Sequence, residues 1–500
     1  MKLARLLDAI ADYTFDGDTK IDIKGLAYDS RKVQKGDLFV AIKGHTQDGH
    51  DYFPEAIRNG TIALLAEKFK VSYGDISRVT VPDSRRALSK LAARFYGNPC
   101  DGMDIIGITG TNGKTTTSYI LESIISSSGG EPGVIGTINS RFQGITIPSA
   151  VTTPESLDLM RIMKKMLDHG VTHVVLEVSS HALDQGRTDD CPFSVVVFTN
   201  FSRDHLDYHN TMEGYFNAKS RLFKELRAGA GKKGIAVING DDPKGEELAS
   251  LVCTEVMTYG LDRKYDVTAD RISTDRKGLK AKLATPMGEM EIRSSLIGEI
   301  NIYNILAATA AALALGFDLD AIGNGIESLK KVPGRMELVE NARGLTVVVD
   351  YAHTPDALLK TQETLRPLTR GRLITVFGCG GNRDRGKRFE MGLVAGENSD
   401  IVFITSDNPR NEDPESIVMQ AQVGVEKSGL AELKWPKDSM SEGPGYFIEV
   451  DRREAIKKAV SIANTNDIIL IAGKGHEDYQ IVGSERRFFD DRKEVILAAA

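Results

Sequence analysis

The amino-acid sequence predicts an α/β protein of several domains, with a mainly parallel sheet and a phosphate-binding loop in its central part. Five hundred residues are too many for one hydrophobic core, so roughly two to four domains are expected. Apolar strand-like runs alternate with helical patterns between residues 98 and 332 and again after residue 333, which is typical of parallel sheets covered by helices. A glycine-rich loop joins the first central strand to a helix.

The composition excludes several classes of protein. Hydrophobic residues make up 41% of the chain and charged residues 27%, as in ordinary globular proteins. The net charge of -7 argues against a broad nucleic-acid surface, so no nucleic-acid partner is expected. The four cysteines lie far apart without a C-x-x-C pair, which favours a reduced compartment and no zinc site. With no cleavage signal and no membrane-length apolar run, we expect a cytoplasmic protein without membrane contact.

Residues 1–97, the expected N-terminal domain, show no catalytic constellation of their own. The pattern predicts strands at residues 21–28, 37–42 and 62–66 and a helix at residues 84–96. Polar turns at residues 28–31 and 44–49 follow strands, where ligands often bind, although each turn alone is more typical of an ordinary connection. Residues 98–102 have the composition of a linker to the next domain.

Residues 98–332 form the expected central domain. Strands are predicted at residues 105–109, 134–137, 173–178, 194–199 and 235–238. Their alternation with helices predicts a mainly parallel sheet with helices on both faces. In open sheets of this kind, ligands bind beyond the carboxyl ends of the strands.

The loop Gly110-Thr-Asn-Gly-Lys-Thr115 lies between the first of these strands and a helix. Its backbone N–H groups and the helix N-terminus would cradle a polyphosphate, Lys114 would neutralise the phosphate charge, and the Thr115 hydroxyl would bind Mg²⁺. The longer phosphate-loop pattern would need glycine where Ile108 stands, so this is a shorter form. A plain glycine turn is the alternative, but the Lys-Thr ending favours nucleotide binding.

Two further side chains are expected at the same sheet edge. Glu177 ends one central strand, and His205 follows the next one. A carboxylate and an imidazole beside nucleotide phosphates are suitable Mg²⁺ ligands. Either residue alone would favour a simpler role, a helix-capping carboxylate or a buried histidine with ordinary partners. Their convergence on one edge favours the metal interpretation.

A Pro-Gly hinge signal at residues 332–337 opens the third segment. Strands at residues 345–350, 373–377, 401–405 and 468–472 predict a second nucleotide-fold-like domain. Polar sequences follow these strands at residues 350–355, 378–388, 406–410 and 473–477, and their arginines suit a ligand that carries a carboxylate. A second phosphate loop at residues 378–381 is the weaker alternative because the Lys-Ser/Thr ending is missing. Residues 435–445 are expected to form a surface loop.

Five motifs together resemble those of the Mur ligase family, the ATP-dependent amide-bond ligases of bacterial peptidoglycan synthesis. They lie at residues 110–116, 177–181, 199–209, 334–337 and 350–355. The resemblance runs from residues 29–31 to residues 473–480, nearly the whole chain. It implies three domains: residues 1–97 for the UDP end of the substrate, residues 98–332 for ATP, and a Rossmann-like domain at residues 333–500 for the amino acid.

The resemblance also implies the chemistry. ATP would phosphorylate a carboxylate, and the amine of an amino acid would attack the resulting acyl phosphate. Residues 407–410 resemble the amino-acid-selecting motif of the ligases that add the third peptide residue. The implied substrates are therefore UDP-N-acetylmuramoyl-L-alanyl-D-glutamate and meso-2,6-diaminopimelate, with ATP and Mg²⁺, and a monomer is expected. A lysine-adding ligase, a folylpolyglutamate-synthase-like ligase and a non-enzymatic ATP-binding module remain alternatives.

Site residues follow from the family motifs, residue by residue. ATP contacts are implied for Gly110, Thr111, Asn112, Gly113, Lys114, Thr115, Thr116, Asn304, Arg335 and Asp350. Contacts to the UDP-muramoyl dipeptide are implied for Ser30, His45, Thr46, Gln47, Thr152, Thr153, Ser179, Gln185 and Arg187. Amino-acid contacts are implied for Arg383, Asp407, Asn408, Pro409, Arg410, Gly473 and Glu477. The implied catalytic residues are Lys114, Lys219, His205 and Glu177, and the implied metal ligands are Thr115, Glu177, His205 and Lys219.

Two of these implied roles need comment. The family resemblance implies that Lys219 is carbamylated, which would turn a cation into a metal-binding carboxylate; a solvated helix lysine is the alternative on sequence alone. In the amino-acid site, Arg410 would pair with the distal carboxylate of diaminopimelate and Glu477 with its ammonium, while the Asn408 amide would donate to the carboxylate. The chain departs from the family at Asn382, where aspartate is common, and in the long loop around Trp435.

Overall fold

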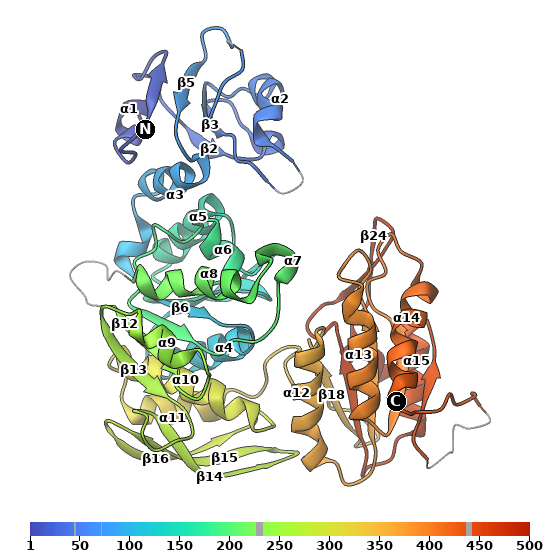
Figure 1. Cartoon of the computed structure of the whole chain (residues 1–500). Coiled ribbons are helices and arrows are strands. Elements are labelled where there is room, and N and C mark those ends of the chain that lie inside the picture. Colours follow the sequence, from blue (N-terminus) through green and yellow to red (C-terminus); the bar gives the residue numbers. More distant parts are fainter. Residues whose placement is uncertain (45–46, 72, 227–233, 437–442) are drawn as a thin grey trace.

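The computed structural model describes residues 1–44, 47–71, 73–226, 234–436 and 443–500. Successive parts of the chain form three regions, an N-terminal one, a central one and a C-terminal one that lies beside the central region (Figure 1). The predicted α/β fold is confirmed, because each region contains a sheet with parallel strand pairs and helices. His45 and Thr46, two of the expected substrate contacts, lie outside the described residues.

The N-terminal region is a five-stranded sheet in the order β1-β5-β4-β3-β2. Its elements are α1 Leu3–Leu7, β1 Thr14–Asp16, β2 Gly25–Ala27, β3 Asp37–Val40, α2 Phe53–Arg58, β4 Ala63–Ala66, β5 Ser77–Thr80 and α3 Ser84–Phe95. The central strands β3 and β4 are fully buried, which explains why their apolar runs were recognisable in the sequence. The expected strand at residues 21–28 is shorter than predicted, and β1 and β5 were not predicted, because each is a short run that contains charged or polar residues.

The central region has an eight-stranded sheet in the order β13-β12-β11-β6-β10-β7-β8-β9. Its strands are β6 Asp104–Thr109, β7 Pro132–Ile135, β8 Asn139–Phe142, β9 Ile145–Pro148, β10 His173–Glu177, β11 Val195–Phe198, β12 Ile235–Asn239 and β13 Glu255–Tyr259. Its helices are α4 Lys114–Ser127, α5 Ser156–Asp168, α6 Ser180–Asp184, α7 Leu206–His209, α8 Met212–Lys224, α9 Gly245–Ser250, α10 Ile300–Ala314 and α11 Leu319–Ser328. The strands from β7 to β13 across the sheet pair in parallel, as predicted.

Strand β6 lies in the middle of this sheet and is buried on both faces. Ile106 and Ile108 pack with α4 and α10 in one hydrophobic core, whereas Ile105 belongs to the core on the opposite face. The phosphate loop at its carboxyl end therefore stands on the most buried part of the sheet.

A separate antiparallel sheet in the central region was not predicted. It consists of β14 Thr268–Asp275, β15 Gly278–Thr285 and β16 Gly288–Ser294. Apolar and charged residues alternate along these strands because one face is exposed, so they lack the continuous apolar runs of buried strands.

The C-terminal region has a six-stranded sheet in the order β17-β18-β22-β19-β20-β21 and a two-stranded hairpin. The sheet strands are β17 Glu337–Leu338, β18 Thr346–Asp350, β19 Leu373–Cys379, β20 Ile401–Ser406, β21 Gly445–Ile448 and β22 Ile468–Ala472, and the hairpin is β23 Tyr479–Val482 with β24 Glu485–Phe488. The helices are α12 Pro355–Leu365, α13 Gly386–Glu397, α14 Pro414–Lys427, α15 Arg452–Ile462 and α16 Asp491–Ala498. Strand β21 begins at Gly445, so the surface loop expected at residues 435–445 is wrong at its end, and residues 437–442 of that loop lie outside the described part.

Two of the contacts between the C-terminal region and the central one bear on the site. Arg276, in the turn between β14 and β15, donates to three backbone carbonyls of the C-terminal region, those of Leu368 (3.0 Å), Thr465 (2.8 Å) and Asn466 (2.6 Å). Asp356, in the first turn of α12, accepts hydrogen bonds from the Asn112 side chain (3.3 Å) and the Ser202 hydroxyl (2.8 Å) of the central region. The second contact places α12 directly against the phosphate loop.

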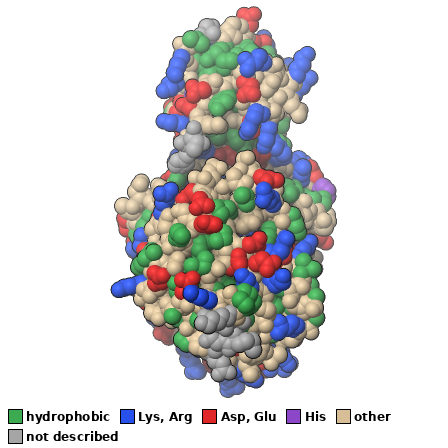
Figure 2. Space-filling model, turned by 90° about the vertical axis from the view of Figure 1, so that its right-hand side faces the viewer, with side chains coloured by type: hydrophobic (Ala, Val, Ile, Leu, Met, Phe, Trp, Pro, Cys, Tyr) green, Lys and Arg blue, Asp and Glu red, His purple; other side chains and the backbone are tan. Residues whose placement is uncertain are grey.

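The surface carries both signs of charge. On the face shown in Figure 2, Lys and Arg side chains are interspersed with Asp and Glu rather than gathered into one basic field. Helices in the described parts of the chain are all too short or too polar to cross a membrane.

Candidate active site

Two positions of the phosphate loop must be glycine, because a larger side chain would clash with neighbouring atoms. Gly110 has φ 145° and Gly113 has φ 86°, conformations that side chains rarely adopt. A Cβ atom at Gly110 would lie 1.9 Å from Thr199 Oγ1, and one at Gly113 would lie 2.4 Å from Asn304 Oδ1. Helix α4 begins at Lys114, so the loop leads directly into a helix N-terminus, where backbone N–H groups can bind anionic oxygens.

The end of the neighbouring strand β11 holds the loop in shape. The backbone N–H groups of Thr111 and Asn112 donate to the backbone and side-chain oxygens of Asn200, both at 2.9 Å. Thr199 Oγ1 donates to the Asn112 carbonyl at 2.6 Å. Asn200 was not among the predicted site residues, although it lies two residues after the end of β11 within one of the family motifs.

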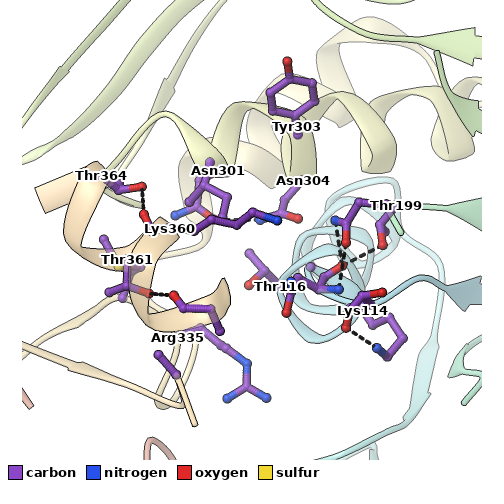
Figure 3. A pocket seen from close by; sticks show the side chains of 18 of the residues that line it. Lys114, Thr116, Thr199, Asn301, Tyr303, Asn304, Arg335, Lys360, Thr361 and Thr364 are labelled. Atoms are coloured by element: carbon purple, nitrogen blue, oxygen red, sulfur yellow. Dashed lines mark hydrogen bonds between the residues drawn. The ribbon is translucent and has the colours of Figure 1, made fainter. Parts of the chain in front are cut away.

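Lys114 folds back over its own loop. Its ammonium donates to the carbonyls of Gly110 (2.8 Å) and Thr111 (2.9 Å). Burial lowers the pKa of Lys114, while the nearby Glu177 and Asp204 carboxylates oppose this shift. Figure 3 shows Lys114 beside the loop, with Thr116 and Thr199 close by. The cation is therefore placed where a bound phosphate would need neutralisation.

Glu177 lies next to the first turn of α4, as the sheet-edge argument expected. Its carboxylate accepts hydrogen bonds from Thr115 Oγ1 (3.0 Å) and from Thr137 Oγ1 (2.8 Å) and N (3.2 Å). The alternative role, a helix cap, is filled by Ser179, whose hydroxyl accepts from the first turn of α6. A hydroxyl and a carboxylate side by side are the oxygen donors that Mg²⁺ prefers, so the donor set fits this ion.

His205 lies at the same edge, with its side chain partly buried. Burial lowers its pKa to about 4, against the opposing charge of Asp204, whose Oδ2 lies 3.5 Å from His205 Nε2. The imidazole is therefore neutral at physiological pH, the form that binds metals. Across the described residues, His, Cys, Asp and Glu side chains form no cluster of three that could hold a metal ion. A Mg²⁺ ion here would need phosphate oxygens as well, which is usual for this ion.

Lys219, on α8, is buried with 2% of its surface exposed, so the alternative of a solvated helix lysine is wrong. Its Nζ donates to the Gly110 carbonyl at 2.7 Å, the same carbonyl that Lys114 contacts. Burial holds the pKa of Lys219 well below its usual value, and the charge of Lys114 lowers it further. The Lys219 amine is therefore far more often neutral than that of a surface lysine.

Residues of the C-terminal region close the site from the other side. Arg335 Nη2 lies 3.4 Å from Thr115 Oγ1, and its guanidinium stacks over the Tyr351 ring at 4.6 Å. Asp350 Oδ2 accepts from the Met336 backbone at 2.7 Å, and burial raises the pKa of this carboxyl. Asn304, on α10, donates to Asn301 Oδ1 at 2.9 Å. The three predicted ATP contacts thus line one cavity together with the phosphate loop.

A cavity of about 910 Å³ lies between these elements. In Figure 3, Asn301, Tyr303 and Asn304 of α10 and the phosphate loop line one side, and Lys360, Thr361 and Thr364 of α12 line the other. Residues Asn301, Tyr303, Lys360 and Thr361 were not predicted as site residues, because none of them belongs to a recognised motif. The volume is that of a typical small-molecule site.

The residues expected to hold the muramoyl dipeptide fall into two groups. In the central region, Thr153 Oγ1 donates to the Glu177 carbonyl (2.8 Å), and Arg187 donates to the Thr153 carbonyl (2.8 Å) and to Gln185 Oε1 (2.7 Å). Thr153 also donates to Ser179 (3.2 Å), and Thr152 contacts Thr137 (3.1 Å). This group adjoins Glu177.

The second group lies in the N-terminal region. Ser30 Oγ donates to Glu55 Oε2 at 2.5 Å, and the Gln47 carbonyl accepts from Gly44 N at 2.8 Å, both within that region. Arg85 connects the two groups, because it donates to the Lys43 carbonyl (3.1 Å) and pairs with Glu155, which lies 3.7 Å from Arg187.

The residues expected to bind the amino acid gather beyond the ends of β20 and β22. Asn408 is buried, and its Nδ2 donates to Glu477 Oε2 at 2.9 Å. Arg410 Nη1 donates to the Gly381 carbonyl at 2.7 Å. A Cβ atom at Gly380 would lie 3.1 Å from Arg410 Nη1 and 3.7 Å from Arg383, so both arginines border this glycine turn. Asp407 and Gly473 face each other, because a Cβ atom at Gly473 would lie 3.3 Å from Asp407 Oδ2.

This cluster modifies the role expected for Asn408. The Nδ2 that would donate to a diaminopimelate carboxylate already uses one of its two hydrogens for Glu477, and Asn408 Oδ1 accepts from the Ile481 backbone at 2.9 Å. Pro409 packs its carbonyl against Gly381 and leads into Arg410, which has a left-handed backbone with φ 53°. The cluster adjoins the ATP-side residues through Gly473 N, which donates to the Asp350 carbonyl at 3.1 Å.

The fold and the loop define a multi-domain α/β protein with a phosphate-binding loop. Family models match three parts of the chain: "Mur ligase family, catalytic domain" over residues 22–96, "Mur ligase middle domain" over residues 108–312, and "Mur ligase, glutamate ligase domain" over residues 334–475. The chain belongs to the Mur ligase family and is an ATP-dependent ligase, which confirms the family predicted from the motifs.

Whole-length relatives support this membership. A UDP-N-acetylmuramoyl-L-alanyl-D-glutamate–2,6-diaminopimelate ligase of Geobacter metallireducens is 47% identical, over 100% of this chain and 98% of the relative. A solved structure with the same name has a TM-score of 0.69 and 34% identity, over 100% of this chain and 99% of that one. A Mycobacterium tuberculosis folylpolyglutamate synthase complexed with ADP and AMPPCP shares the fold, with a TM-score of 0.62 and 20% identity over 78% of this chain and 92% of that one.

Proposed function

We propose that this ligase adds meso-2,6-diaminopimelate to UDP-N-acetylmuramoyl-L-alanyl-D-glutamate with ATP and Mg²⁺, in peptidoglycan synthesis. The main support for this proposal is the polar cluster of the C-terminal region, in which Arg410 and Arg383 border one glycine turn and Glu477 lies beside Asn408. Such a site offers cations and an anion to a side chain that ends in both a carboxylate and an ammonium. The names of relatives 41% to 47% identical to this chain support the same substrates.

The proposed reaction has two steps. The free carboxylate of the muramoyl dipeptide attacks the γ-phosphorus of ATP, which gives an acyl phosphate and ADP. The amine of diaminopimelate then attacks the acyl carbon, the amide forms, and inorganic phosphate leaves. The protein contributes positioning and charge neutralisation, because the transferred phosphoryl group gathers negative charge from both partners.

The phosphate loop and its neighbours take defined roles in this scheme. Lys114 would move from the carbonyls of Gly110 and Thr111 to the phosphate and neutralise its charge. Arg335, which lies beside Thr115, would contact the phosphate oxygens from the C-terminal region. Mg²⁺, when bound, offsets phosphate charge; Thr115, Glu177 and His205 would hold one ion, and Lys219 as a carbamate would hold a second. Thr153, Ser179, Gln185 and Arg187 are proposed to position the dipeptide.

Three domains are proposed, with boundaries at residues 97/98 and 332/333. The first would hold the UDP end, the second ATP and the third the amino acid. Their sheets come from successive parts of the chain, and Glu155 and Asp356 lie at the contacts between them. A cytoplasmic location and a monomeric state stay predictions.

Replacing Arg410 tests the proposed amino-acid site. Arg410→Lys should lower kcat/KM for diaminopimelate about tenfold to a hundredfold, because a point charge does not replace a planar fork that can grip a carboxylate. The KM for ATP should stay unchanged. Initial rates of phosphate release against amino-acid concentration measure the effect, with Arg366→Lys, a half-exposed arginine paired with Asp400, as the matched control. An Arg410→Ala enzyme that keeps the wild-type preference for diaminopimelate over L-lysine would contradict the assignment.

A further inference from the structure

Lys474 is a buried cation at the centre of the polar cluster, and the role proposed above leaves it unused. Its side chain has 0% exposure, and its ammonium lies 3.2 Å from Glu477 Oε2, 3.3 Å from Asn408 Oδ1 and 3.5 Å from Asp407 Oδ1. A fully buried lysine is rare unless it is paired, because the charged form loses its hydration. Its partners here are three residues of the proposed amino-acid site.

The local backbone explains why Lys474 points inward. It stands between Gly473 and Gly475, which have φ 115° and φ 52°. A Cβ atom at Gly475 would lie 2.7 Å from Tyr351 Cβ and 2.8 Å from the Gly334 carbonyl, so only glycine fits. These two turns at the end of β22 direct the lysine side chain into the cluster rather than towards solvent.

The charges of the cluster show what the ammonium does there. Asp407 and Glu477 are both within 3.5 Å of Lys474, so without it two carboxylates would share one buried space. Asn408 Nδ2 also donates to Glu477 Oε2, and the Tyr479 ring lies 5.5 Å from the ammonium. Arg452, another buried cation of this region, pairs with Asp491 and not with Glu477; its Nη2 lies 2.7 Å from Asp491 Oδ2. Lys474 is therefore the cation that directly contacts Glu477.

We propose that Lys474 is a positioning residue of the amino-acid site, whose ammonium holds the Glu477 carboxylate in place to receive the ammonium of the incoming amino acid. The inference rests on the proposed function and extends it to a residue outside the expected contacts. Lys474 does not touch the reacting atoms, so its effect should appear in amino-acid binding and should pass through Glu477.

A double-mutant cycle tests this coupling. Lys474→Met should raise the KM for diaminopimelate at least about tenfold, with kcat changed less than about threefold and the KM for ATP unchanged. Glu477→Gln should also raise this KM. In the Lys474→Met/Glu477→Gln enzyme, the KM should match that of Glu477→Gln within about twofold, because Lys474 has lost the group through which it acts. Lys458→Met, which removes a lysine paired with Glu449 in the same region, is the control and should match the wild type.

Removing one partner of a buried pair can unfold a protein, so the single Lys474→Met enzyme is checked by its melting temperature. If it does not fold, the Lys474→Met/Glu477→Gln enzyme, which loses one positive and one negative charge, is compared with Glu477→Gln. This comparison still shows whether Lys474 acts through Glu477. Equal KM values in those two enzymes support the proposal, and a further tenfold rise in the double variant overturns it. A folded Lys474→Met enzyme with wild-type KM also overturns it. Wild-type enzyme that ignores diaminopimelate would instead refute the proposed function, so the two failures are distinguishable.

Discussion

Lys114→Ala should reduce ligation at least about a thousandfold while the protein stays folded. The loss is expected in kcat, because Lys114 neutralises charge that grows as the phosphoryl group is transferred. The ammonium donates to two carbonyls of its own loop, and burial lowers its pKa. The folded state therefore disfavours the charged form, and removing it should leave the melting temperature close to that of the wild type.

The measurement is phosphate release under saturating substrates, beside a thermal melt. Lys164→Ala is the matched control, since Lys164 is a half-exposed lysine of the same region that pairs with Asp168. The control should keep wild-type turnover. Near-normal turnover of a folded Lys114→Ala enzyme would remove the basis for the phosphate-loop assignment.

Lys219→Ala should be nearly inactive, with a loss of about a hundredfold or more, and a short-chain carboxylic acid should restore part of the activity. The reason is the proposed carbamate, which forms when the neutral amine adds CO2 and releases a proton. Burial and the neighbouring Lys114 hold the pKa of Lys219 well below its usual value, so the reactive neutral amine is available near neutral pH. The small cavity left by the substitution would admit formate or acetate beside Gly110.

A second measurement separates the carbamate from a packing role. Wild-type activity should fall when dissolved CO2 is removed and return when bicarbonate is added, whereas Lys219→Ala should not respond to bicarbonate. Lys224→Ala, at the end of the same helix, serves as the control. Full activity of unrescued Lys219→Ala would show that the buried amine is not needed for the reaction.

The sequence predicted those strands that are buried on both faces, because such strands contain continuous runs of apolar residues. Strands β6, β10 and β11 each contain a continuous apolar run because helices cover both faces of their sheet, and the prediction found them within one or two residues. The sheet of β14, β15 and β16 was missed because its exposed face interrupts that pattern. The edge strand β21 was missed because it begins inside an expected loop.

The sequence predicted those parts of the site in which a motif directly follows a strand of the parallel sheet. Thr115 and Glu177 meet as expected, because parallel neighbours bring their carboxyl ends to the same edge. The particular side-chain hydrogen bonds between distant segments were not predicted, even where both residues were expected in one site. Asp356 reaches Asn112 across 244 residues, and Asn408 binds Glu477 across 69. Lys474 sat inside a recognised motif, but only the surrounding glycine turns show that it points inward.

The most direct test of the proposed function is which amino acid stimulates phosphate release in the presence of ATP, Mg²⁺ and UDP-N-acetylmuramoyl-L-alanyl-D-glutamate. Meso-diaminopimelate should stimulate release strongly, and the new amide should appear in equal amount by mass spectrometry. L-Lysine should stimulate it at least about a hundredfold less in kcat/KM, because Arg410 and Arg383 would lack a carboxylate to pair with. Equal use of L-lysine, or stimulation only by glutamate with a folate acceptor, would contradict the account.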